Sequence, residues 1–227
     1  MHKYKDIKYN LVKRKRKTIS IYVERDGDVQ VIVPERMSIE EVENAIELKR
    51  TWIYSKLTEW EYFNDPKVER EFVNGESFMY LGRNYRLEIV DNQDTSLKLY
   101  HGSFSLRKKD VKKANDVFKQ FYKEKGFPKI QERVEHYKKI MDVEPKQIRI
   151  IDLSNRWGSC TDDGGINFHW KTLMAPMKII DYIVVHELAH LIYKNHSPEF
   201  WSVVDKIMPD YKEREMWLDE NGASLDI

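Results

Sequence analysis

An apolar stretch at residues 177–193 constrains this chain more than any other feature, because it holds three polar side chains in its second half. A segment that is apolar on almost every side is typical of a buried helix. His186 and His190 are four residues apart, so both imidazoles would project from one face of that helix. Glu187 would point about 100° further round, and a buried carboxylate is costly unless a partner compensates its charge. The stretch therefore predicts a buried helix built around a polar site.

The spacing His-Glu-Leu-Ala-His is typical of zinc-dependent hydrolases. In that pattern two histidines bind one metal ion, and the glutamate is the general base toward a water that the metal activates. His196, six residues further on, is the expected third ligand and leaves the fourth tetrahedral position for water. We therefore predict zinc bound by His186, His190 and His196, with Glu187 as the catalytic residue.

Three glutamates compete with His196 as the third ligand, because another large class of zinc peptidases uses a glutamate there. Glu199, Glu213 and Glu215 lie in a polar C-terminal segment, where an exposed side chain is the ordinary expectation. His196 needs only a short return of the chain. Asn195 is suited to the left-handed conformation that would end the helix and turn His196 back toward the metal.

Composition limits the classes of protein to which the chain can belong. It has 227 residues, 39 basic and 38 acidic side chains, and one cysteine, Cys160. A framework of internal disulfides and a cysteine-rich metal site are therefore excluded. No apolar run reaches the ~20 residues that span a bilayer, and the first residues contain no apolar signal segment. We expect a cytoplasmic globular protein without a membrane partner.

A basic run from Lys13 to Lys17 raises the possibility of a nucleic-acid partner. The first twenty residues hold eight basic side chains against one acidic side chain, Asp6, and such a segment attracts phosphate. Residues 199–227 hold eight acidic side chains against three basic ones, so the whole chain is almost neutral. A solvated strand on a polarised surface is therefore the alternative interpretation of the run.

The first part of the chain has the pattern of strands around one long helix. Residues 18–23 and 29–33 are rich in β-branched side chains, and the turn residues Asp26 and Gly27 between them predict a hairpin. Ser38 and Glu41 have the spacing of a capping box, which predicts the start of a helix that continues to about residue 62.

The rest of the chain alternates between strand and helix patterns. Residues 72–107 have the pattern of a β-meander, and a helical pattern begins near residue 111. Gly126 and Pro128 interrupt that pattern, so we expect two helices there. Three short strands are predicted next, at residues 148–153, 156–160 and 165–170. Residues 165–170, as an edge strand beside the histidine helix, could pair with an extended peptide.

These patterns predict an α+β protein with two domains. Residues 1–108 would form an N-terminal β-rich module with one long helix. Residues 109–227 would form the catalytic domain, in which a short sheet packs on helices that carry the metal site.

Several motifs taken together resemble one known family. They are Arg156-Trp-Gly-Ser-Cys160, Ile166-Asn167, Leu173-Met-Ala-Pro176, residues 185–191 around the paired histidines, and Asn195-His-Ser-Pro-Glu-Phe-Trp201. With these motifs the chain resembles the YgjP-like family of zinc-dependent hydrolases, which is related to the SprT and minigluzincin metallopeptidases. The resemblance implies a zincin-like catalytic domain, zinc on the three histidines and a catalytic Glu187. His169 stands where the family more often has asparagine.

The resemblance leaves two substrate classes open. Members are usually described as metallopeptidases, and relatives of this type have also been described as pyrophosphatases that act on UTP. Arg156, Asn167 and His169 are the candidate substrate-binding residues. We favour a peptide substrate, because residues 166–170 are apolar and aromatic, whereas the acidic loop 161–165 would repel a triphosphate. A metal-stabilised nucleic-acid-binding module without enzymatic activity is the further alternative.

Overall fold

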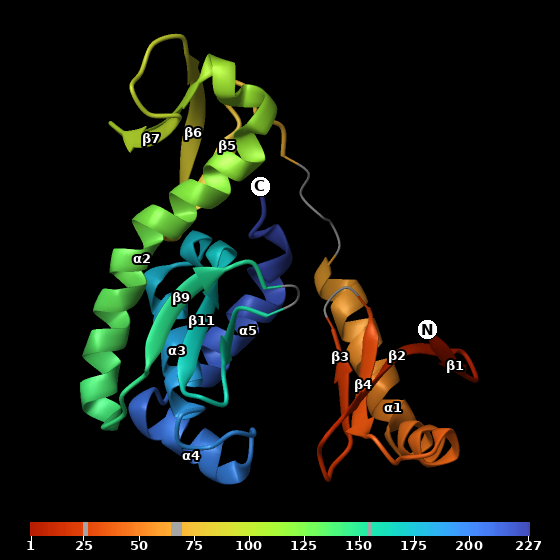
Figure 1. Cartoon of the computed structure of the whole chain (residues 1–227). Helices are drawn as coiled ribbons and strands as arrows, with labels where there is room; N and C mark the ends of the chain where they lie inside the picture. The colour runs from red at the N-terminus through yellow and green to blue at the C-terminus, as the bar shows by residue number, and fades with distance from the viewer. Residues whose placement is uncertain (25–26, 65–69, 154–155) are drawn as a thin grey trace. The chain divides into compact units, whose positions relative to one another are not determined.

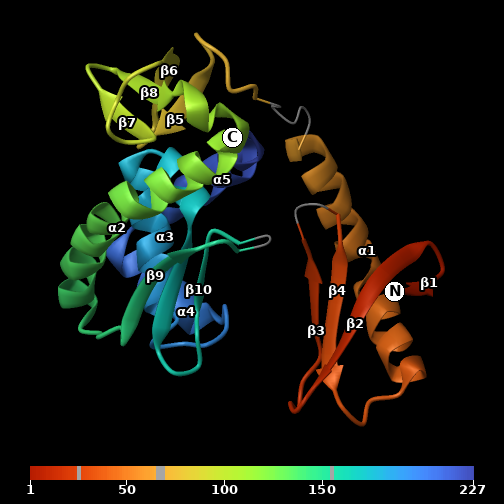
Figure 2. The same cartoon turned by 45° about the horizontal axis from the view of Figure 1, so that its top comes forward.

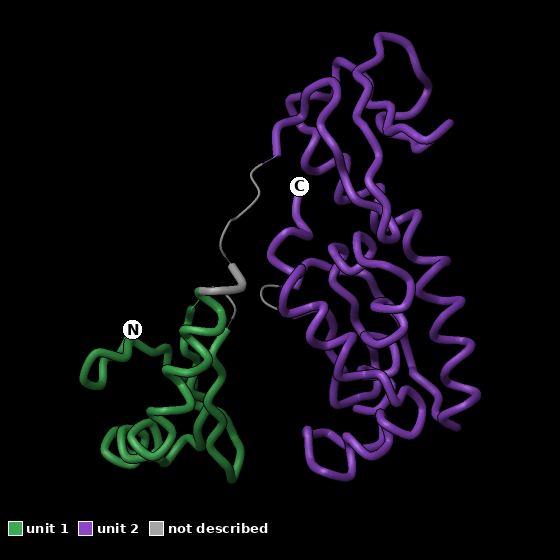
Figure 3. The backbone as a smooth tube through the Cα atoms, turned by 180° about the vertical axis from the view of Figure 1, so that it is seen from behind, with its two compact units in different colours: residues 1–67 green, residues 68–227 purple. Residues whose placement is uncertain are grey.

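The computed structural model describes residues 1–24, 27–64, 70–153 and 156–227. Small sheets and helices confirm the predicted α+β class. The chain divides into two compact units, residues 1–67 and 68–227 (Figure 3). Asp26, at the tip of the predicted hairpin, lies outside the described residues. None of the helices in the described ranges is long and apolar enough to cross a membrane.

Unit 1 combines a four-stranded sheet with one long helix, α1 (Ile39–Asn64). The strands pair in the order β1-β2-β4-β3, with β2 parallel to β4 and the other pairs antiparallel. Their bounds are β1 (His2–Tyr4), β2 (Ile7–Arg14), β3 (Ser20–Val23) and β4 (Val29–Pro34). The predicted capping box is confirmed, because the Ser38 N–H donates to Glu41 Oε2 at 2.8 Å and the Glu41 N–H donates to Ser38 Oγ at 3.2 Å.

Unit 1 has a hydrophobic core of its own. Apolar side chains of β2 and β4 pack against the buried face of α1, to which Val42, Ile46 and Ile53 contribute. These side chains form a cluster separate from the apolar cluster of unit 2. Burial of each such side chain contributes about 1.5–3 kcal/mol to the folded state, so unit 1 holds its shape through its own residues.

Unit 2 begins with a second four-stranded sheet that packs on α2 (Ala114–Met141). Its strands pair in the order β5-β6-β8-β7, and Phe78 and Phe104 from this sheet contact Phe118 of α2, with ring centroids 4.5 and 5.2 Å apart. The bounds are β5 (Ser77–Tyr80), β6 (Arg83–Val90), β7 (Leu97–Tyr100) and β8 (Ser103–Arg107), followed by η1 (Lys108–Lys113). The boundary predicted at 108/109 therefore falls inside unit 2, because the sheet and α2 share one core.

The prediction of two helices around Gly126 and Pro128 is wrong, because α2 runs through both residues. Pro128 is exposed, so water can satisfy the carbonyl that loses its helical hydrogen bond. Gly126 is buried against η2 (Trp170–Met174), where a Cβ would come within 2.3 Å of Leu173 Cγ. Tertiary packing of the buried face thus outweighs the local helix-breaking signal.

A three-stranded sheet and the C-terminal helices complete unit 2 (Figures 1 and 2). The strands β9 (Gln147–Ile151), β10 (Gly158–Cys160) and β11 (Gly165–His169) pair in the order β10-β11-β9. The prediction of β11 as an edge strand is wrong, because β9 pairs with it in parallel and β10 in antiparallel register. The helices are α3 (Met177–Ala189), α4 (Pro198–Ile207), α5 (Tyr211–Asn221) and η3 (Gly222–Ser224). The edge strand that contacts α3 is β10.

Candidate metal centre

The predicted histidine helix is α3, and it ends within the motif. His190 caps the helix with right-handed backbone angles, φ −68° and ψ −15°. The Tyr193 N–H donates to the Ala189 carbonyl at 2.9 Å and continues the turn. The prediction of a left-handed Asn195 is wrong, because this residue is not among those with positive φ. Tight right-handed turns at the end of α3 reverse the chain direction without a left-handed residue at position 195.

A second helix begins directly after His196 and fixes its place. Ser197 is the N-cap of α4, and its Oγ accepts a hydrogen bond from the Phe200 N–H at 3.5 Å. Pro198 occupies the first turn, where its missing N–H costs nothing. Phe200 is fully buried and anchors the helix in the core of unit 2. His196 therefore stands between two helix ends that are both held by backbone hydrogen bonds.

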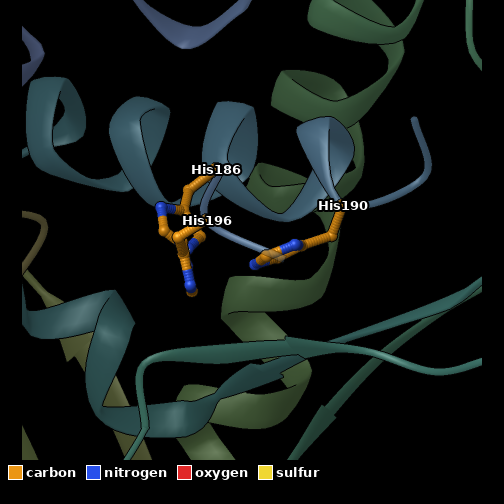
Figure 4. A group of neighbouring side chains, drawn as sticks. All are labelled: His186, His190 and His196. Atoms are coloured by element: carbon orange, nitrogen blue, oxygen red, sulfur yellow. The ribbon is translucent and has the colours of Figure 1, made fainter. Parts of the chain in front are cut away.

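The structure brings His186, His190 and His196 together, as the spacing predicts. Figure 4 shows the three rings directed toward one another. Their ligand atoms all lie within 4.8 Å of one another, and the Nε2 atoms of His186 and His196 are 2.9 Å apart. As whole residues, His186 and His190 are partly buried and His196 is exposed. In the described part of the chain, no other group of His, Cys, Asp or Glu side chains has a metal-binding arrangement.

The Nδ1 atoms of His190 and His186 differ in their surroundings. His190 Nδ1 lies 3.1 Å from the Tyr193 carbonyl oxygen. A carbonyl only accepts, so Nδ1 carries the proton and Nε2 keeps the lone pair that a metal needs. His186 Nδ1 is buried and has no hydrogen-bond partner among the described residues. The tautomer of His190 therefore leaves its Nε2 lone pair available to a metal ion.

Burial keeps the three imidazoles neutral. It lowers the pKa of His186 well below the usual value, and the neighbouring His196 and His190 lower that pKa further. Burial also lowers the pKa of His190. It lowers the pKa of His196 to about 4, together with the repulsion that a protonated His190 would exert. A neutral imidazole is the form that binds metal ions.

Glu187 is a buried carboxyl group without a hydrogen-bond partner for Oε2 among the described residues. Burial raises the pKa of Glu187 to about 8, and the positive charge of Arg156 opposes that rise. The carboxyl group lies against the backbone of Gly158 in β10, where a Cβ would come within 2.5 Å of Oε1. A buried carboxyl oxygen without a hydrogen bond is rare outside functional sites, so Glu187 is a candidate for catalysis.

The donor set fits a tetrahedral metal ion with imidazole ligands. With zinc–nitrogen bonds of about 2.0–2.1 Å, two ligand nitrogens lie roughly 3.3 Å apart. The spacings of 2.9 Å and up to 4.8 Å among the three histidines bracket this value. The competing glutamates Glu199, Glu213 and Glu215 do not belong to the cluster; Glu215 hydrogen-bonds with Tyr182.

Two of the three predicted substrate-binding residues are engaged inside the fold. Asn167 is buried in β11, and its Nδ2 donates to Ser159 Oγ at 3.2 Å. His169 Nδ1 accepts from the Lys171 N–H at 3.0 Å, and Nε2 lies 3.3 Å from Asp152 Oδ1. Burial, reinforced by the charge of Lys171, lowers the pKa of His169 to about 4. His169 therefore caps η2, and its two ring nitrogens are occupied.

Arg156, the third of these residues, is exposed and lies two residues before β10. Its charge acts on Glu187. Sequence reasoning missed the role of Gly158, although the glycine stands in the same Arg156-Trp-Gly-Ser-Cys160 motif. It also missed the Tyr193 carbonyl, since any residue provides a carbonyl and no side-chain signal marks it.

A comparison with protein-family models matches residues 17–221 to a family described as YgjP-like, metallopeptidase domain. The chain belongs to the YgjP-like family. The resemblance noted from the motifs is thereby confirmed, and this YgjP-like protein is a metallohydrolase whose family implies a bound metal ion.

One solved structure is similar to part of this YgjP-like chain. It is described as the crystal structure of the metallopeptidase zymogen of Pyrococcus abyssi abylysin. The sequences are 30% identical, the match covers 38% of this chain and 89% of that chain, and the TM-score is 0.36. No curated protein matches the chain.

Proposed function

We propose that this protein is a zinc-dependent metallopeptidase that cleaves a peptide bond with a water activated at Glu187. The observation that carries the proposal is the convergence of three imidazoles next to a buried carboxyl group whose Oε2 has no hydrogen-bond partner among the described residues, within a metallopeptidase-type family.

Each residue of the site has a distinct role in this mechanism. His186, His190 and His196 hold the metal through their ring nitrogens. When bound, zinc lowers the pKa of water toward ~7 and polarises the carbonyl under attack. Glu187 takes a proton from the attacking water and passes it to the departing amine; burial raises the pKa of this carboxyl group, which makes the carboxylate a stronger base.

The edge strand β10 supports a peptide as the substrate. The Trp157 carbonyl accepts from the His169 N–H, and the Thr161 N–H donates to the Gly165 carbonyl, each at 2.8 Å. Backbone groups alternate in direction along a strand, so those of Gly158 face away from β11. Within the described ranges no strand pairs with that outer side. An extended peptide on this edge would pass the residue that touches Glu187.

A nucleoside triphosphate fits the surroundings less well. Phosphate recognition needs several cations or N–H donors around the anion. Asn167 donates a hydrogen bond to Ser159, both ring nitrogens of His169 have partners within the fold, and the adjacent loop carries Asp162 and Asp163. Of the three predicted substrate-binding residues, Arg156 is then the candidate for phosphate binding. We therefore place peptide hydrolysis ahead of the pyrophosphatase and nucleic-acid-binding alternatives.

The test compares the wild type with Glu187→Gln, each loaded with zinc, on unfolded proteins, peptides and UTP. We expect peptide cleavage by the wild type and a loss of at least ~10²-fold in Glu187→Gln, with the metal content unchanged. Pyrophosphate release from UTP that disappears in Glu187→Gln, without peptide cleavage, would replace the peptidase by the pyrophosphatase. Absence of all hydrolysis with metal present would favour a binding module.

A further inference from the structure

His196 is the exposed member of the histidine cluster, and its ring is held in a different way from that of His190. A backbone carbonyl orients His190 through Nδ1. The face of His196 instead lies on the indole of Trp201, with ring centroids 5.6 Å apart and an interplanar angle of 26°. Offset stacking of this kind restricts the rotation of a side chain that faces solvent.

Trp201 is itself held on two sides. Its backbone N–H donates to the Ser197 carbonyl at 3.2 Å, which fixes the main chain within the first turn of α4. Its indole also stacks on Tyr211, the first residue of α5, at 5.2 Å and 18°. Tyr211 is buried in the core of unit 2. The stack therefore connects an exposed ring of the metal centre to a buried anchor on another helix.

The indole reaches a second histidine of the cluster as well. The rings of Trp201 and His186 meet edge to face, with centroids 5.8 Å apart and an interplanar angle of 67°. One side chain thus contacts both His186 and His196, the two rings whose Nε2 atoms lie 2.9 Å apart. A shift of the indole would change the relative orientation of both nitrogens.

We propose that Trp201 is a positioning residue that, with Tyr211 behind it, holds His196 in the orientation required for metal binding. This inference rests on the proposed binding of a metal by the three histidines. Residues that orient ligands from outside typically change metal affinity by about 10–100-fold when they are removed. An aromatic ring that fills the place of the indole should preserve most of the effect.

The variants Trp201→Leu, Trp201→Phe and Tyr211→Leu test this role in the full chain. The matched control is Trp217→Leu, since Trp217 is also partly buried against the core of unit 2 but is absent from the described ring contacts of the cluster. The readouts are Zn²⁺ affinity by competition with a chelator, the visible absorption spectrum of bound Co²⁺, and thermal unfolding of the metal-free protein.

We expect Trp201→Leu to lose about 10–100-fold in Zn²⁺ affinity and to alter the Co²⁺ spectrum. Trp201→Phe should recover most of both, and Tyr211→Leu should lose less than Trp201→Leu. Trp217→Leu should lower the unfolding temperature of the metal-free protein and leave the affinity and the spectrum unchanged. If Trp201→Leu does not fold, Trp201→Phe and Tyr211→Leu carry the comparison.

Wild-type affinity and an unchanged Co²⁺ spectrum in Trp201→Leu would overturn the positioning role while leaving the metal site intact. An equal loss of affinity in Trp217→Leu would also overturn it, because general destabilisation would then be the cause. Absence of Zn²⁺ and Co²⁺ binding by the wild type would overturn both the proposed metal site and this inference.

Discussion

Glu187 lies so close to Gly158 that a Cβ on the glycine would come within 2.5 Å of Oε1 and 2.7 Å of the carboxyl carbon. The contact joins the middle of the histidine motif to the edge strand on which we place the substrate. It also explains why there is room for a buried carboxyl group against the sheet, because the residue of β10 that faces it is a glycine without a side chain.

The first prediction concerns this contact. Gly158→Ala should push the Glu187 carboxyl group aside and lower kcat/KM by about 10²-fold, because the general base would lose its position. The three heavy atoms nearest the new methyl group all belong to Glu187, so we expect metal content to stay at the wild-type level. Activity and metal content are measured on the same sample. Full activity in Gly158→Ala would contradict the assigned place of Glu187.

The second prediction separates the possible third ligands. His196→Ala should weaken Zn²⁺ binding by at least about 100-fold, because one of three nitrogens is removed. Glu199→Gln is the matched control: Glu199 is exposed, three residues away, and hydrogen-bonds to Ser197. Chelator competition measures both. Loss of binding in Glu199→Gln with retention in His196→Ala would reverse the assignment.

The third prediction concerns the stability of unit 2 in acid. Burial opposes ionisation of Asp110, but hydrogen bonds from Arg107, Ser96 and Lys113 outweigh it and lower the pKa of Asp110 to about 2. A carboxyl group with a lowered folded-state pKa contributes stability above its unfolded pKa, near 3.8, and loses it as the pH falls toward 2. Asp110→Asn should remove this part of the acid sensitivity. Urea unfolding of both proteins between pH 5 and pH 2.5 measures how the free energy of unfolding changes with pH. An equal change with pH in the two proteins would refute the prediction.

The fourth prediction tests the packing of α2. Gly126→Ala should destabilise the protein by about 1–3 kcal/mol, since the new methyl group would overlap the Leu173 side chain. Pro128→Ala, two residues away on the exposed side, should instead stabilise by up to about 3 kcal/mol, because the helix regains a hydrogen bond. Denaturant unfolding measures the change in the free energy of unfolding for each variant. A stable Gly126→Ala would mean that Leu173 moves aside at little cost.

Local features of the sequence predict local structure well. The start of α1 follows from Ser38 and Glu41, whose reciprocal hydrogen bonds involve residues three apart. The meeting of His186 and His190 follows from helical spacing alone. His196 needed only a short return of the chain, so its approach could be predicted even though the wrong residue, Asn195, was assigned to the turn.

Features that depend on distant residues could not be predicted in this way. The central place of β11 depends on parallel pairing with β9, which no local pattern encodes. His169 looked like a site residue, and only its neighbours Asp152 and Lys171 show that its nitrogens are taken. The continuity of α2 depends on the fit between Gly126 and Leu173, some 47 positions apart in the chain.

The shared helix α2 has a consequence for how the protein responds to its metal. One face of α2 packs under the β5–β8 sheet and another contacts α3, which carries His186 and ends at His190. A ligand that binds only the native state lowers the population of open forms throughout the cooperative unit to which it belongs. Metal loading should therefore slow proteolysis and amide exchange at residues 77–107, in a sheet that contributes no ligand. Metal binding could then be measured through the β5–β8 sheet, without any substrate.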